Sequence, residues 1–186
     1  MKKNYILCFC AFILLINILV YIRFVQYPQR QQVVIARELG TISEPLSADS
    51  TVELPLEGNG DMLVSFSVFF STYGRKNMGE ISLEILNQGK IITQNTVDMQ
   101  NLEDNAWYDF SGLDVRLEKG EAYQVKLTST PIKGGISVWF DNDGVLVSSY
   151  WQTHQITPFE WLFVNITYSV VCLIILGIHF WLRKEG

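Results

Sequence analysis

The sequence predicts an all-β antiparallel sandwich or jelly roll of eight or nine strands, flanked by N- and C-terminal transmembrane helices. Three observations lead to this prediction. Apolar and polar residues alternate with a period of two through the middle of the chain. Clusters of Gly, Asn and Asp separate the alternating runs, as turns do. Two long apolar runs stand at the ends of the 186-residue chain.

The first apolar run covers residues 5–22, and Asn17 is its only polar side chain. A helix of about 20 mostly apolar residues crosses the hydrocarbon core of a bilayer, so we predict a membrane anchor over residues 1–25. Lys2 and Lys3 also give the basic start of a signal peptide. No small-residue cleavage site follows the run, which favours an uncleaved anchor.

The second apolar run covers residues 161–182. Thr157, Pro158 and Glu160 precede it with the spacing of a helix N-cap, first turn and capping box. We therefore predict a second transmembrane helix with a short basic tail over residues 158–186.

Basic residues flank the outer ends of both predicted helices: Lys2, Lys3, Arg183 and Lys184. The positive-inside rule then predicts a two-pass cell-membrane protein with both termini in the cytoplasm and residues 26–157 outside. All three cysteines lie in the apolar runs, so the region between them has no disulfide. An exported domain without disulfides is typical of a bacterial envelope.

The strands are predicted from the alternation in residues 26–157. In residues 62–70, one face carries Val64, Phe66, Val68 and Phe70, with Ser65 and Ser67 opposite. Further runs of this kind are residues 80–86, 113–117, 123–127 and 136–140. Pro55 marks residues 52–56 as an edge strand or strand end. Residues 33–36 either open the first strand or continue a stalk.

The charge of the middle region limits its partners. Residues 26–157 hold nine Lys or Arg and 17 Asp or Glu, a net charge of about −8. This balance disfavours nucleic acid and anionic lipid as partners. A neutral glycan or a basic protein remains compatible with it.

The region lacks the usual catalytic and metal-binding patterns. Its one histidine is His154, it has no cysteine, and it has no HExxH, GxSxG, CxxC or glycine-rich phosphate loop. Residues 141–144 resemble part of a calcium loop, but Gln152 stands where an EF-hand needs Glu. A hairpin turn is the simpler interpretation, and a calcium shared with another loop stays open. We predict a non-enzymatic protein without a cofactor or metal.

Aromatic residues are the candidate ligand-binding residues. We select Trp107, Tyr108 and Trp139, because an exposed Trp or Tyr offers a flat platform for a sugar ring or a protein partner. The alternative is that Trp107 and Trp139 are packing residues. Tyr150 and Trp151 could instead rest at the bilayer surface.

Asn17 and Asn165 are polar residues within the two apolar runs. If the helices run antiparallel, both lie at a similar depth. They would then either hydrogen-bond to each other or face a larger membrane partner.

Residues 107–129 combine an apolar strand, a Lys119-Gly120 turn and a strand with Tyr123, Val125 and Leu127. This order resembles jelly-roll domains of the carbohydrate-binding-module type. It is also similar to extracytoplasmic β-sandwich portions of Gram-positive membrane proteins linked to surface polysaccharide synthesis. The resemblance implies the fold, and glycan binding by analogy.

Two functional hypotheses follow from these predictions. The first is a membrane-anchored envelope protein that binds a glycan or cell-wall polymer beside a polysaccharide-handling complex. The alternative is an accessory subunit that docks through its helices onto a larger polytopic glycosyltransferase or transporter. A hydrolase with an unrecognised carboxylate pair is a weaker third hypothesis.

Overall fold

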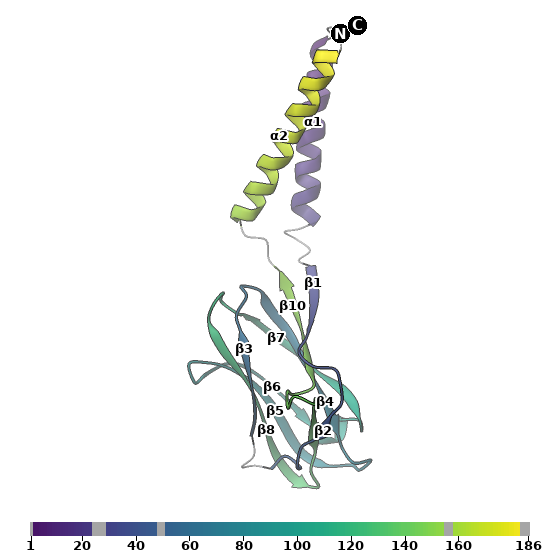
Figure 1. Cartoon of the computed structure of the whole chain (residues 1–186), viewed down its shortest axis with the longest axis vertical. Coiled ribbons are helices and arrows are strands. Elements are labelled where there is room, and N and C mark those ends of the chain that lie inside the picture. Colours follow the sequence, from purple (N-terminus) through teal and green to yellow (C-terminus); the bar gives the residue numbers. More distant parts are fainter. Residues whose placement is uncertain (1, 24–28, 48–50, 155–157, 183–186) are drawn as a thin grey trace. The chain divides into compact units, whose positions relative to one another are not determined.

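A computed structural model describes residues 2–23, 29–47, 51–154 and 158–182 of the chain (Figure 1). The chain divides into two compact units. One comprises Met1–Gln29 and Gln155–Gly186 and holds two helices, and the other, Arg30–His154, holds the strands. Thr157, Arg183 and Lys184, which support the predicted cap and orientation, lie outside the described residues. The domain boundaries at residues 25 and 157 stay a prediction.

The elements follow one another along the chain in this order: α1 (Lys2–Tyr21), β1 (Gln29–Val34), β2 (Thr41–Ile42), β3 (Thr51–Glu57), β4 (Met62–Ser71), β5 (Met78–Asn87), β6 (Lys90–Asp98), the 3₁₀ turn η2 (Met99–Asn101), β7 (Ala106–Arg116), β8 (Ala122–Lys133), β9 (Ser137–Phe140), β10 (Ser148–His154) and α2 (Pro158–Leu182).

The two helices do not support the predicted membrane topology. Within the residues that the structure describes, no helix combines the length and apolar character that a bilayer crossing requires. A crossing needs about 20 mostly apolar residues. The predicted localisation, a two-pass cell-membrane protein with both termini cytoplasmic, is therefore wrong.

The strands form an antiparallel sandwich of two sheets (Figure 1). Five strands of the six-stranded sheet follow the order β1-β10-β4-β9-β2. The sixth strand, β7, lies off this path and pairs with β4. The four-stranded sheet has the order β3-β8-β5-β6. Both sheets contribute to one core, whose fully buried side chains include Phe66, Phe70, Ile81, Leu83, Ile85, Leu127 and Val138. The predicted β-sandwich is thus confirmed.

The alternation predicted for β4 holds for most of the strand but fails at its start. Phe66, Val68 and Phe70 are fully buried, as predicted. Val64 is only half-buried, and Leu63 takes the inward position in its place. The register shifts at this point, between Leu63 and Ser65, against both β10 and β7, and such a bulge reverses the inward and outward positions on its two sides.

The described residues form ten strands, where the sequence predicts eight or nine. Residues 33 and 34 are the last two residues of β1, so they end the first strand. The strand β2 has only two residues, which is too short for an alternating pattern to predict it. Pro55 lies in the edge strand β3. The run at residues 113–117 is the second part of the longer β7.

Residues 141–144 form the predicted turn between β9 and the bridge at Leu146. Asp141 Oδ1 accepts hydrogen bonds from the backbone N–H groups of Asp143 (3.0 Å) and Val145 (2.8 Å). Gly144 has φ +78°, which glycine adopts without steric cost. The carboxylate of Asp141 therefore stabilises the turn itself.

Candidate functional site

The six-stranded sheet has one face turned away from the core. Because side chains alternate along a strand, the burial of Phe110 in β7, Phe66 in β4 and Tyr150 in β10 places their neighbours on the opposite face. We call this surface the outer face. Its central residues are Trp107, Asp109 and Ser111 of β7, Ser65, Ser67 and Phe69 of β4, and Ser149 and Trp151 of β10.

The outer face contains two hollows. The first hollow, of about 330 Å³, is lined by Gln32, Arg37, Ser67, Trp107 and Ser149. Its volume lies within the range of small-ligand pockets. The indole of Trp107 is 45% exposed and packs edge-on against Phe69, with ring centroids 5.4 Å apart. An indole held in this way offers an apolar surface whose orientation is fixed by its neighbour.

The second hollow, of about 420 Å³, occupies the neighbouring part of the same face. Its lining residues are Arg30, Val64, Ser65, Asp109, Ser111, Gly112, Asp114 and Trp151. Trp151, which is 37% exposed, stands opposite Ser65 in the strand register. This hollow therefore combines an indole, a guanidinium and two carboxylates with small hydroxyl groups.

Hydrogen bonds fix polar residues that line the two hollows. Ser67 Oγ donates to Asp109 Oδ1 at 2.8 Å across the β4–β7 pair. Gln32 Nε2 donates to Ser149 Oγ at 3.2 Å and thereby links β1 to β10. The floor of the outer face is thus ordered before any ligand binds, which lowers the entropic cost of binding.

A bulge in β7 shapes the second hollow. The register against β4 shifts here, so the residues between Ser111 and Val115 oppose a single residue of β4. Gly112 (φ +72°) and Asp114 (φ +39°) both adopt left-handed backbone conformations. Such bulges turn side chains toward new directions and are frequent near binding sites. A left-handed non-glycine residue that lines a hollow also fits a functional constraint.

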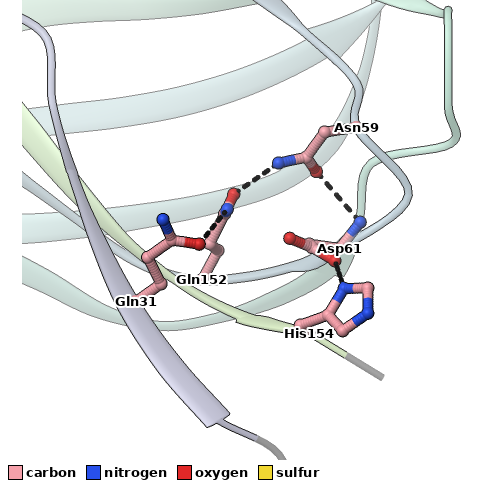
Figure 2. A network of polar contacts seen from close by, with 5 residues as sticks. All are labelled: Gln31, Asn59, Asp61, Gln152 and His154. Carbon is pink, nitrogen blue, oxygen red and sulfur yellow. Dashed lines mark hydrogen bonds and ion pairs between the residues drawn. The ribbon is translucent and has the colours of Figure 1, made fainter. Parts of the chain in front are cut away.

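A polar network fixes the ends of the strands that carry the second hollow (Figure 2). Asn59 Nδ2 donates to Gln152 Oε1 at 2.7 Å, and Gln152 Nε2 contacts Gln31 Oε1 at 3.5 Å. Oδ1 of the buried Asp61 lies 2.7 Å from Nδ1 of His154. Gln31 and Gln152 directly adjoin Arg30 and Trp151 in sequence, so the network positions both hollow-lining residues.

The charge of Asp61 also affects the core beside this network. Burial raises the pKa of the Tyr150 hydroxyl above its ordinary value, and the negative charge of Asp61 adds to this effect. The Tyr150 ring stacks on Phe66, with centroids 6.2 Å apart and planes 5° from parallel. Tyr150 therefore belongs to the core and not to the ligand-binding surface.

The structure separates the three aromatic residues predicted to bind a ligand. Trp107 lines the first hollow. Tyr108 is half-buried on the inward side, 5.0 Å from the Phe110 ring. Trp139 is half-buried and donates from Nε1 to Asn105 Oδ1 at 3.2 Å. Neither Tyr108 nor Trp139 lines the two hollows, and their predicted contact with a ligand stays untested.

Sequence reasoning missed Trp151, Arg30 and Arg37 as site residues. The sequence leaves open whether Trp151 rests at a bilayer surface, and it shows the two arginines only as charges. A weak signal was present, because Trp151 follows the inward Tyr150 and so points outward in an alternating strand. Arg30 precedes and Arg37 follows the run at residues 33–36, whose sequence is compatible with a first strand or with a stalk.

The two helical asparagines make their described bonds within their own helices. Asn17 Nδ2 donates to the carbonyl of Ile13, and Asn165 Nδ2 donates to that of Trp161, each at 2.9 Å. Bonds of this type pair the side-chain N–H donor with a backbone carbonyl one turn earlier in the same helix. The predicted contact of Asn17 and Asn165 with each other or with a partner stays a prediction.

Comparisons with known proteins give no family. No family model and no curated protein matches the chain.

Among the described residues, no group of three or more His, Cys, Asp or Glu could hold a metal ion.

Several solved structures overlap with the chain. The infectious bursal disease virus VP2 subviral particle has a TM-score of 0.42 and 13% identity, over 70% of this chain and 34% of that one. An exo-β-1,3-galactanase from Phanerochaete chrysosporium with galactose has a TM-score of 0.39 and 11% identity, over 68% and 28%. A family 35 carbohydrate-binding module from an environmental isolate has a TM-score of 0.39 and 12% identity, over 69% and 91%.

These structural neighbours include a carbohydrate-binding module and a galactan-degrading enzyme. The chain spans only about a third of the length of the first two. At such TM-scores the likeness carries no argument about what this chain binds. The resemblance to Gram-positive proteins of polysaccharide synthesis stays a prediction.

Proposed function

We propose that the sandwich, within residues 26–157, binds a glycan on the outer face of the six-stranded sheet. One observation carries the proposal. Trp107 and Trp151 each line a hollow on this face, and hydroxyl, carboxylate and guanidinium groups line the same two hollows. Apolar rings stack on the C–H faces of sugars, while the polar groups can donate hydrogen bonds to sugar hydroxyls and accept hydrogen bonds from them.

The spacing of the two indoles favours a chain of sugars over a single one. Trp107 opposes Phe69 and Trp151 opposes Ser65, four residues apart along β4 and on opposite sides of it. Four residues at about 3.3 Å and two strand spacings of about 4.8 Å give a diagonal of roughly 16 Å. A ligand that contacts both indoles must therefore be an oligosaccharide or a polymer.

The decisive experiment compares tryptophan variants of the full-length chain in a titration against a panel of soluble plant, bacterial and fungal polysaccharides. Trp107→Ala and Trp151→Ala should each lower the affinity for the bound glycan by about tenfold or more, because each removes one stacking surface. Trp107→Phe retains a flat ring and should retain most of the affinity.

Trp139→Ala is the matched control, because Trp139 is a half-buried tryptophan that lines neither hollow. Unfolding midpoints of all variants must stay close to that of the unmodified chain for the comparison to hold. If the panel contains no ligand, or if Trp107→Ala and Trp151→Ala bind as tightly as the unmodified chain, the proposed function is wrong.

A further inference from the structure

We propose that the first hollow selects an acidic sugar, with Arg37 as the counter-ion for the carboxylate of a uronic acid residue. The proposal rests on the glycan-binding function above and names the class of glycan. It assigns a charge-specific role to Arg37, which lies in the segment between β1 and β2.

The lining of the first hollow is neutral except for Arg37. The other four residues are an indole, two hydroxyl groups and one amide, from Trp107, Ser67, Ser149 and Gln32. In the described part of the chain, ion pairs join Arg116 to Glu118 and His154 to Asp61, and no pair includes Arg37. The guanidinium of Arg37 is thus exposed with its charge uncompensated by the groups that share its hollow.

The remaining groups suit a sugar ring that carries a carboxylate. A guanidinium presents five N–H donors in a planar fork that binds both oxygens of a carboxylate. Ser149 Oγ accepts a hydrogen bond from Gln32, so its own hydrogen can be donated to a ligand. The Trp107 indole supplies the apolar surface for the ring itself.

The second hollow has the opposite charge balance. Arg30 shares it with two carboxylates, those of Asp109 and Asp114. A bound uronate would be repelled there, whereas the hydroxyl groups of a neutral sugar can donate to both aspartates. The two hollows together therefore fit a polymer in which an acidic unit neighbours a neutral or weakly charged unit.

The net charge of about −8 over residues 26–157 does not prevent this arrangement. At physiological ionic strength, exposed charges further apart than about 8 Å are largely screened from each other. A guanidinium and a carboxylate in direct contact within a hollow are screened much less. Binding of the acidic glycan should therefore persist at ~0.15 M salt.

The test uses matched ligands that differ only in charge. Oligogalacturonate, oligomannuronate and hyaluronan fragments are titrated against the full-length chain, each beside its own methyl-esterified form. Esterification removes the carboxylate charge and leaves the sugar rings intact. We expect at least one acidic form to bind roughly tenfold more tightly than its ester, as a charge-assisted hydrogen-bond pair requires.

The variants identify the residue responsible. Arg37→Gln should abolish the preference for the acidic form while retaining affinity for the ester, whereas Arg37→Lys should retain part of the preference. Arg75→Gln is the control, since Arg75 is also exposed and lines neither hollow. It should leave the preference for the acidic form intact.

Several results would overturn the proposal, and they differ from a failure of the glycan-binding function. Any of three results would refute the acidic-sugar site while leaving glycan binding intact. They are equal affinity for acid and ester, binding of neutral glycans alone, and a preference for the acid that survives in Arg37→Gln. A sulfated glycan that binds as tightly as the uronate would refute the assignment to a carboxylate. Absence of binding to every acidic and neutral glycan would refute both proposals.

Discussion

Asp104 illustrates how a single carboxylate holds the loop after β4. Its Oδ1 accepts hydrogen bonds from Ser71 Oγ (3.0 Å) and from the backbone N–H of Thr72 (2.6 Å). Its Oδ2 accepts from the Asn105 side chain at 3.2 Å. Desolvation pushes the pKa of Asp104 up, but hydrogen bonds from Ser71, Thr72 and Gly74 outweigh it, so the pKa lies below its ordinary value of 3.8.

This lowered pKa predicts a pH-dependent contribution to stability. A carboxylate whose pKa is lower in the folded state stabilises the fold above its unfolded pKa, and the contribution disappears as the pH falls through the folded pKa. Asp104→Asn should therefore unfold at a lower temperature than the unmodified chain at pH 7, and the difference should shrink as the pH falls below 4. Thermal unfolding at several pH values measures this. A difference that is independent of pH would contradict the prediction.

At the scale of elements, the β5–β8 pair depends on one glycine. Gly79 has φ +129° at the register shift between β5 and β8. A Cβ at this position would lie 2.4 Å from the carbonyl oxygen of Thr130 and 2.8 Å from Pro131 Cα. Both contacts involve backbone atoms, which cannot rotate away.

Gly79→Ala should therefore lower the free energy of unfolding by about 3 kcal/mol or more, as a backbone clash adds to the strain of a positive φ. Gly89→Ala is the control, because Gly89 has φ +77° in a turn with no atom within 4 Å of the added Cβ. It should lose only about 1–2 kcal/mol. Chemical denaturation measures both values, and equal losses would show that the clash is relieved by local shifts.

At the scale of the whole molecule, the polar network of Figure 2 joins the start and the end of the strand-forming unit. Gln31 lies in β1, Asn59 in the loop between β3 and β4, and Gln152 near the end of β10. Gln152 is buried, so its amide needs partners within the protein. The network therefore couples the fold's stability to the position of Trp151 and Arg30.

Asn59→Ala should test this coupling. It leaves the Gln152 carbonyl oxygen without its donor, which should lower the free energy of unfolding by about 1–3 kcal/mol. The glycan affinity should fall as well, because Trp151 and Arg30 lose their fixed positions. Asn142→Ala, at an exposed turn residue, is the control for stability. Loss of stability with unchanged glycan affinity would show that the network does not position the second hollow.

Much of the sandwich was predictable because local patterns encode it. The alternation in residues 80–86 and 123–127 correctly identifies the buried residues of β5 and β8, since an alternating strand buries one face. The role of Trp107 in ligand binding stays a prediction, and the structure leaves this side chain partly exposed. The sequence does not predict the bulge at Val64, because it depends on pairing with β7 and β10, which are remote in the chain.

The sequence by itself determined the strand character, the turns, the acidic balance and the absence of cysteine from the sandwich, since each depends on local composition or spacing. Only the tertiary structure decided which side chains share a surface. Arg37, Trp107 and Ser149 come from three separate segments, which meet around one hollow only in the folded sandwich. Such convergence is set by register and sheet order, which depend on contacts between residues remote in the chain.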